Sequence, residues 1–140
     1  MEHVFNRGEI KHQLRAKQLH SFEGLIRRRG ITPTDIDGVI EYTGGKAFVL
    51  IEGKTLDAPF PKGQKQALES MTDKWQESGS EAILILFQHT VPVDEIVIVA
   101  TQKVTDYYYQ KAWHKPVKDT TVLEAIEFFE QHCERKNINI

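Results

Sequence analysis

The sequence predicts an α/β fold in which a mixed β-sheet is flanked by helices, in the order α-β-β-α-β-β-α. Three observations lead to this class. Apolar residues recur at helical spacing in three segments, shorter apolar runs typical of strands lie between them, and glycine or proline separates most of these segments. At 140 residues the chain can bury a substantial core, so we expect a single domain over residues 1–140.

The first half of the chain predicts a helix, a hairpin and a second helix. Residues 9–29 have an apolar stripe with basic residues around it, and Gly30 follows as a stop signal. Residues 37–42 (DGVIEY) and 46–53 (KAFVLIEG) are expected to pair, because the intervening glycines favour a tight turn. Helical spacing returns over residues 62–78.

The second half predicts strands and a final helix. Residues 81–88 (EAILILFQ) form a continuous apolar run, which is typical of a central strand buried on both faces. Residues 93–102 (VDEIVIVATQ) are predicted as another strand, and residues 104–114 are expected to extend it or pair with it. Residues 120–135 have the apolar spacing of a helix.

Composition restricts the class of protein. The formal net charge of −2 does not fit a general polyanion-binding protein, although a local basic patch would still bind nucleic acid. The single cysteine, Cys133, forms no internal disulfide and no cysteine-based zinc site, so we expect it in the core. Without an apolar run of membrane-spanning length or a signal peptide, the sequence predicts a cytoplasmic protein with no membrane partner.

Charged side chains end the second hairpin strand. Glu52 and Lys54 are two positions apart, so they share one face of the strand. Asp37 opens the preceding strand, and the start of one hairpin strand lies beside the end of its partner. Two carboxylates and an amine are therefore expected together. Carboxylates suit Mg²⁺ or Mn²⁺, and such a site would support phosphodiester hydrolysis.

The Glu-x-Lys tripeptide alone is weak support for a site. It occurs at residues 9–11, 52–54 and 134–136, and only the middle copy ends an apolar strand with an acidic hairpin partner. The structural alternative is a surface ion pair that contributes little to stability. A phosphate-binding loop ending in GKT is disfavoured, because Phe48 occupies the position of the first glycine.

The segments TPTDIDGVIEYTGGKAFVLIEGKT and PKGQKQALESM together resemble the PD-(D/E)XK nuclease superfamily, and in particular its small phage-type members. The resemblance covers about residues 20–88. It implies a restriction-endonuclease-like fold and a nuclease that cleaves DNA with Mg²⁺ or Mn²⁺, encoded by a phage and acting in the host cytoplasm. Cleavage of four-way junctions would favour a homodimer, since two strands must be cut symmetrically.

The resemblance also implies roles for individual residues. Asp37 and Glu52 match the metal-binding carboxylates, and the carbonyl of Gly53 matches a further metal ligand. Lys54 matches the catalytic lysine. Gln64, which opens the next helix, matches a glutamine found near that lysine or near the scissile phosphate, so Asp37, Glu52, Lys54 and Gln64 form the expected catalytic set.

Other acidic residues extend or complicate this assignment. Glu23 in the first helix matches an acidic metal ligand that some members contribute. Asp35 competes with Asp37 for the role of first ligand, and Asp37 is preferred because it directly opens the strand. The chain departs from the pattern in having Ile36 before this aspartate, and only residues 31–32 offer the strand that usually precedes it.

Basic and aromatic residues elsewhere are candidates for DNA contacts. The candidates with a basic side chain are Arg27, Arg28, Arg29, His89, Lys111 and Lys115. Each has a structural alternative, such as basic residues at a helix end or a histidine satisfied within the fold. The rival function is a catalytically silent domain on the same fold that binds nucleic acid or protein. Such a domain would not need Asp37, Glu52 and Lys54 together.

Overall fold

The computed structural model describes residues 21–140 of the chain. The chain divides into two compact units, Met1–Pro33 and Thr34–Ile140, which are considered separately. In its described part the first unit forms turns and one short 3₁₀ helix, Arg28–Gly30. The expectation of a single domain over residues 1–140 stays a prediction.

The prediction of a helix over residues 9–29 is wrong for residues 21–29. Gly24 and Arg29 have φ values of 84° and 60°, left-handed conformations that a right-handed helix does not contain. The side chains of Leu25 and Ile26, expected on an apolar helix face, are exposed. Residues 9–20 lie outside the described residues.

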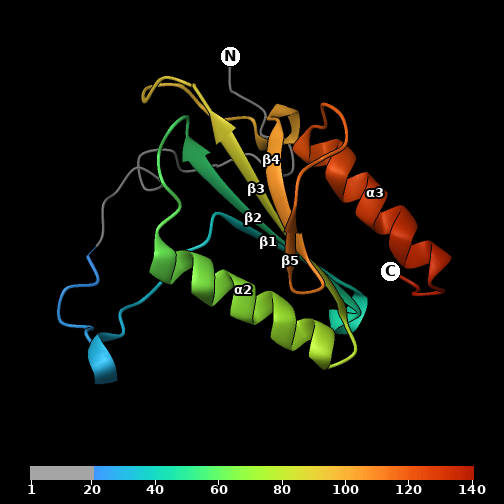
Figure 1. The fold of residues 1–140 in the computed structure, drawn as a ribbon, viewed down its shortest axis with the longest axis horizontal. Coiled ribbons are helices and arrows are strands. Elements are labelled where there is room, and N and C mark those ends of the chain that lie inside the picture. Colours follow the sequence, from blue (N-terminus) through green and yellow to red (C-terminus); the bar gives the residue numbers. More distant parts are fainter. Residues whose placement is uncertain (1–20) are drawn as a thin grey trace, which may run out of the picture. The chain divides into compact units, whose positions relative to one another are not determined.

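The second unit is an α/β structure built on an open, five-stranded mixed sheet with two helices (Figure 1). The strands lie in the spatial order β1-β2-β3-β4-β5, and only the β2–β3 pair is parallel. The strands are β1 (Gly38–Tyr42), β2 (Ala47–Thr55), β3 (Glu81–His89), β4 (Val104–Tyr109) and β5 (Ala112–His114). The helices are α2 (Lys62–Glu77), which crosses from β2 to β3, and α3 (Val122–Arg135), which follows β5.

Most predicted elements of this unit are confirmed. The hairpin closes through a 3₁₀ turn, Thr43–Gly45, in which Gly44 and Gly45 take the positive φ that the turn requires. β3 is buried over its first seven positions, as expected for a central strand. α3 begins after a Thr121–Glu124 capping box, in which each side chain accepts a hydrogen bond from the other residue's backbone N–H.

The predicted strand over residues 93–102 is wrong. This segment is a loop with a short 3₁₀ helix, Val99–Thr101. β3 is already paired with β2 and β4, so no free edge of β3 remains for another strand. Val97 and Val99 instead pack against the core from the loop, which explains the alternating apolar pattern. The sheet is completed by β4 and β5, which form a hairpin within the predicted 104–114 segment.

Strand side chains alternate between two cores, one under each helix. One core contains Val49, Ile85 and Phe87 from the sheet with residues of α3, including the buried Cys133. The second core lies on the opposite sheet face under α2. It contains Leu50, Leu84, Leu68 and Tyr108, with Phe48 and Trp75 packed against them. Even-numbered residues of β2, which include Glu52 and Lys54, therefore share the α2 face.

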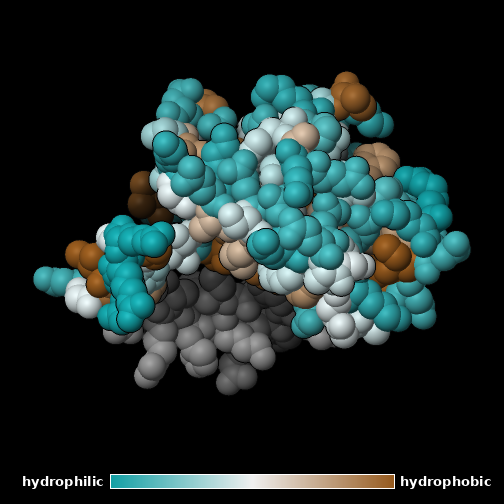
Figure 2. Space-filling view, turned by 60° about the horizontal axis from the view of Figure 1, so that its bottom comes forward, coloured by the Kyte–Doolittle hydropathy of each residue, from teal (hydrophilic) through white to brown (hydrophobic). Residues whose placement is uncertain are grey.

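On the face seen in Figure 2, hydrophilic residues dominate and hydrophobic residues occur singly or in small groups. No helix within residues 21–140 is long and apolar enough to cross a membrane.

Candidate active site at the end of β2

The hairpin register brings two carboxylates together. Gly38 pairs with Ile51, so Asp37 comes beside Glu52 at the next position. The backbone N–H of Asp37 donates to Oε2 of Glu52 at 3.1 Å, and the N–H of Gly53 donates to Oδ2 of Asp37 at 2.8 Å. Each carboxylate therefore caps the other strand, and the predicted proximity of Asp37 and Glu52 is observed.

Lys54 closes the group on the α2 side. Its Nζ lies 2.9 Å from Oε1 of Glu52 and 2.8 Å from Oε1 of Gln64. The Glu52 side chain is 3% exposed and that of Lys54 is 19% exposed, so this is not the solvated surface pair of the structural alternative. A buried carboxylate needs such partners, since an unpaired charge would be costly to bury.

Gln64 links Lys54 to Asp35, the residue that competes with Asp37 as first metal ligand in the sequence. The helix α2 begins two residues earlier, so Gln64 projects from its first turn. Its Nε2 donates to the carbonyl oxygen of Asp35 at 3.1 Å and lies 3.4 Å from the Asp35 carboxylate. Asp35 thus contacts Gln64 rather than the Asp37–Glu52 pair. No sequence motif indicates this contact, because it depends on how α2 packs on the segment before β1.

Gly53 is required by packing on the other sheet face. A Cβ atom at this position would lie 2.6 Å from Cε2 and 2.8 Å from Cε1 of the Phe87 ring, distances that side chains do not adopt. Phe87 is 2% exposed and belongs to the core under α3. The glycine in the Glu-x-Lys motif therefore lets Phe87 cover the strand directly behind Glu52 and Lys54. The role of its carbonyl as a metal ligand stays a prediction.

The donor set fits a hard divalent cation with few protein ligands. Within residues 21–140, no group of three or more His, Cys, Asp or Glu side chains is arranged to hold a metal ion. Asp37 and Glu52 supply two carboxylates, and Asp37 is exposed. Mg²⁺ is commonly bound by one or two carboxylates, with water and substrate phosphate completing its shell. The residues present therefore fit Mg²⁺ or Mn²⁺ better than a metal that needs a full protein cage.

The predicted DNA-contact residues of the second unit lie in different places. Lys111 lies in the β4–β5 turn and pairs with Glu77 at 3.3 Å, about 20 Å along α2 from Gln64. Lys115 pairs with Asp106 at 2.9 Å. His89 ends β3 and accepts a hydrogen bond from the Val91 N–H on Nδ1 at 3.2 Å. Strand alternation puts His89 on the Phe87 face, opposite Lys54.

The remaining predicted site residues belong to the first unit. Glu23 lies in a turn, where its backbone N–H donates to Oγ of Ser21, so its predicted place on a helix is wrong. Arg27, Arg28 and Arg29 do not end an α-helix either, and all of them are exposed. Their predicted contacts with metal or DNA stay predictions.

The other described copy of Glu-x-Lys shows what the tripeptide does outside a site. Glu134 and Arg135 end α3 and Lys136 follows as its C-cap, where it pairs with Glu81 at 3.0 Å instead of with Glu134. The copy at residues 9–11 lies outside the described residues. The arrangement at residues 52–54 therefore comes from the hairpin and α2, and not from the tripeptide itself. No protein-family model, curated protein or solved structure matches the chain.

Proposed function

We propose that this protein is a metal-dependent nuclease that hydrolyses DNA phosphodiester bonds and has a restriction-endonuclease-like fold. The observation that carries the proposal is the convergence of Asp37, Glu52 and Lys54, with Gln64 bonded to the lysine. The order of an aspartate before a strand, a hairpin into Glu-x-Lys and a helix opening with Gln64 supports the resemblance to phage-type PD-(D/E)XK nucleases.

Each residue of the site has a role in this proposal. Asp37 and Glu52 hold Mg²⁺ or Mn²⁺, a cation that lowers the pKa of a bound water and stabilises negative charge on a phosphoryl group. Lys54 orients the attacking water through its ammonium. Glu52 and Gln64 fix the position of that ammonium, since each accepts a hydrogen bond from Nζ.

Positive charge beside the site supports a phosphate-containing substrate. The N-terminus of α2 carries Lys62 and Lys65 next to Gln64, and free N–H groups at a helix start favour anions. Glu52, Leu86 and Asp106 are aligned across three strands, which places Asp106 about 10 Å from Glu52. The Lys115 paired with Asp106 is therefore closer to the site than Lys111.

The test is cleavage of a labelled DNA panel by the full chain. The panel contains single-stranded, duplex, flapped and four-way-junction DNA, each incubated with Mn²⁺, Mg²⁺ or EDTA. We expect cleavage that requires metal and falls at least about a hundredfold in Lys54→Ala, a typical effect of removing a catalytic group. A Lys46→Ala variant, which removes an exposed lysine outside the site, is the matched control and should cleave normally.

The same experiment separates the proposal from its rival. A folded wild-type protein that binds the panel but cleaves none of it would favour a catalytically silent nucleic-acid-binding domain. Equal cleavage by wild type and Lys54→Ala would point to a contaminating nuclease and would remove the support for this site.

Sedimentation of the protein with junction DNA tests the proposed homodimer, which should bring two active sites to one junction.

A further inference from the structure

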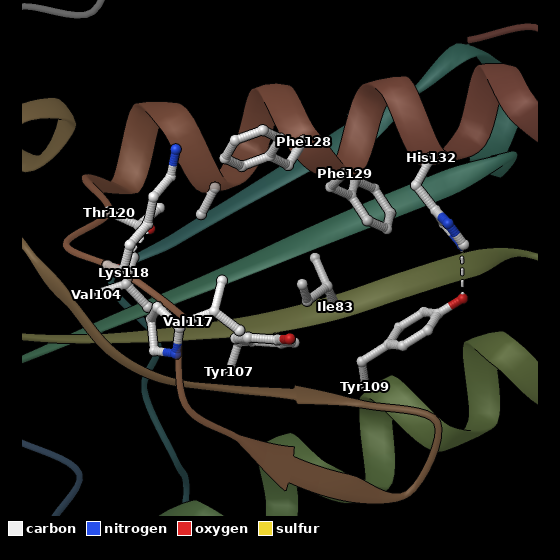
Figure 3. Close-up of a pocket in the computed structure, with 12 residues that line it drawn as sticks. Ile83, Val104, Tyr107, Tyr109, Val117, Lys118, Thr120, Phe128, Phe129 and His132 are labelled. Carbon is white, nitrogen blue, oxygen red and sulfur yellow. Dashed lines mark hydrogen bonds between the residues drawn. The ribbon is translucent and has the colours of Figure 1, made fainter.

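A cavity lies on the opposite face of the sheet from Lys54. Its volume is about 430 Å³, within the range of small-molecule sites. It is bounded by α3, by β3 and β4, and by the segment of residues 116–120 that leads into α3 (Figure 3). Its lining residues Ile83, Val104 and Phe129 belong to the core under α3, whereas Glu52 and Lys54 lie on the α2 face, so the cavity is separate from the Asp37–Glu52 site.

The walls of the cavity are apolar and aromatic. Tyr107 and Phe129 form its sides together with aliphatic residues of the sheet, and Phe128 lies at its rim, where it is 49% exposed. Among residues 21–140, no carboxylate side chain lines the cavity. The lining groups that can carry positive charge are Lys118 and His132. The cavity thus combines apolar walls, several of them aromatic side chains, with basic side chains and no described carboxylate.

The polar groups at the two ends differ in how far they are satisfied. At one end, the Tyr109 hydroxyl lies 2.8 Å from Nε2 of His132 and donates to Glu81, so these groups already serve the fold (Figure 3). At the other end, Nζ of Lys118 lies 5.9 Å from the centroid of the Phe128 ring. Within residues 21–140, Lys118 has no ion pair and the Tyr107 hydroxyl has no hydrogen bond. These two groups are open to a ligand.

We propose that this cavity binds a small amphipathic anion, with a planar apolar ring system and a single carboxylate. The ring system packs against Tyr107 and Phe128, where flat apolar bodies gain most from aromatic contacts. The carboxylate pairs with Lys118, whose ammonium lies over the Phe128 ring and forms no salt bridge among the described residues, although the more distant Glu124 carboxylate also attracts it. A nucleobase fits less well, because its several donors and acceptors would find few partners on these walls.

The probe for this proposal is naphthoate, with naphthalenemethanol as its uncharged counterpart. Each is titrated into the full chain and followed by proton–nitrogen correlation NMR. We expect saturable shifts in β4, residues 116–120 and α3, and none around Lys54. The alcohol should bind about tenfold more weakly, since it lacks the charge that Lys118 attracts.

Two variants and a control make the test specific. Lys118→Ala removes an exposed side chain and should weaken naphthoate about tenfold while leaving the alcohol unchanged. Ala125→Phe fills the cavity and should abolish both interactions. Lys46→Ala changes the net charge equally and should change neither.

Three outcomes would overturn the proposal. One is the absence of saturable shifts, and another is equal naphthoate affinity in wild type and Lys118→Ala. The third is self-association through this face, seen as concentration-dependent sedimentation that Ala125→Phe abolishes and naphthoate does not alter. That result would show a second copy of the chain as the occupant. None of these measurements depends on nuclease activity.

Discussion

The ammonium of Lys54 and the amide of Gln64 are joined by a hydrogen bond of 2.8 Å that connects the end of β2 to the start of α2. The other end of this amide donates to Asp35, so the orientation of the Gln64 side chain is fixed by a cation on one side and two oxygen atoms on the other. The lysine of the site therefore has its position set from outside the Glu-x-Lys motif.

Replacing Gln64 should lower nuclease activity without unfolding the protein. Gln64→Ala leaves the Lys54 ammonium with Glu52 as its one remaining protein acceptor among the described residues, and we expect kcat to fall about tenfold to a hundredfold. Gln64→Glu keeps an acceptor for the lysine and should retain more activity. Steady-state cleavage kinetics measure both. An alanine variant with unchanged kcat would show that Gln64 only supports α2.

Asp35 should act on the lysine through Gln64. In Asp35→Asn the backbone carbonyl that receives the Gln64 amide is retained, and so is a side-chain oxygen, so we expect near-normal cleavage. Asp35→Pro keeps the backbone carbonyl, removes the side-chain oxygen and restricts the backbone, and is expected to lower kcat with KM for DNA little changed. A metal-binding role for Asp35 predicts the reverse for Asp35→Asn, namely a higher metal concentration needed for half-maximal activity.

Adding a methyl group at Gly53 should destabilise the fold through Phe87. Gly53→Ala forces the Phe87 ring out of a closely packed core, and we expect a loss of about 1–3 kcal/mol in the free energy of unfolding. Urea unfolding followed by circular dichroism gives this value. Gly63→Ala is the matched control, because nothing lies within 4 Å of a Cβ at that position.

A double-mutant cycle identifies the cause. Phe87→Leu removes ring atoms next to Gly53, so Gly53→Ala should cost clearly less in that background than in the wild type. Additive effects of the two substitutions would mean that the loss comes from the strand backbone and not from contact with the ring.

The contact between Asp37 and Glu52 could be expected from the sequence, because both residues lie in a hairpin that local patterns predict. The turn glycines set the hairpin, and the hairpin register sets the neighbours. The place of Gln64 in the site is implied by the resemblance alone. Its contact with Asp35, and that of Phe87 with Gly53, depend on packing between segments that lie far apart in the sequence. No local spacing encodes such contacts.

The wrong predictions of a strand over residues 93–102 and of a helix over residues 21–29 also arise because local spacing does not report long-range packing. The apolar alternation at Val97 and Val99 is typical of a strand, but the pattern is also satisfied by a loop that faces a core. Periodicity reports which side chains are buried and does not report whether a strand edge is free to pair. The stripe through Leu25 and Ile26 predicts a helix, yet the chain makes a turn at Gly24 and only the short 3₁₀ helix Arg28–Gly30 follows.

The start of α3 should contribute stability that depends on pH. The pKa of Glu124 is held below its usual range, chiefly by the hydrogen bond from the Thr121 backbone N–H. A lowered pKa in the folded state stabilises the protein above the ordinary glutamate pKa, and that contribution is lost as pH falls through the folded value. We therefore expect Glu124→Gln to lower the urea midpoint near neutral pH and to approach the wild type as the pH falls through the lowered pKa of Glu124. Glu127→Gln, an exposed change on the same helix outside the capping box, is the control for the loss of a carboxylate from α3.

The buried carboxylate of Glu81 should stabilise the second unit by hydrogen bonding to three of its segments. It accepts hydrogen bonds from Gln76 of α2 at 2.9 Å, Tyr109 of β4 at 2.8 Å and Lys136 after α3 at 3.0 Å. Burial and the hydrogen bond to Glu81 raise the pKa of Tyr109, so its hydroxyl stays a donor over the whole neutral range. Glu81→Leu keeps the volume but leaves these donors without their acceptor.

We expect Glu81→Leu to lower the free energy of unfolding by roughly 2–3 kcal/mol, because the half-buried donors of Gln76 and Tyr109 lose their shared acceptor. The Lys136 contribution to this sum is small, since its side chain is 47% exposed and solvent screens the pair. Glu134→Ala removes an exposed carboxylate nearby and should change stability by less than about 0.5 kcal/mol. Hydrogen exchange supplies the second readout: amides at the end of α2 and in the β4–β5 turn should lose protection together. Loss of protection at one element alone would mean that Glu81 supports that element and does not join the others to it.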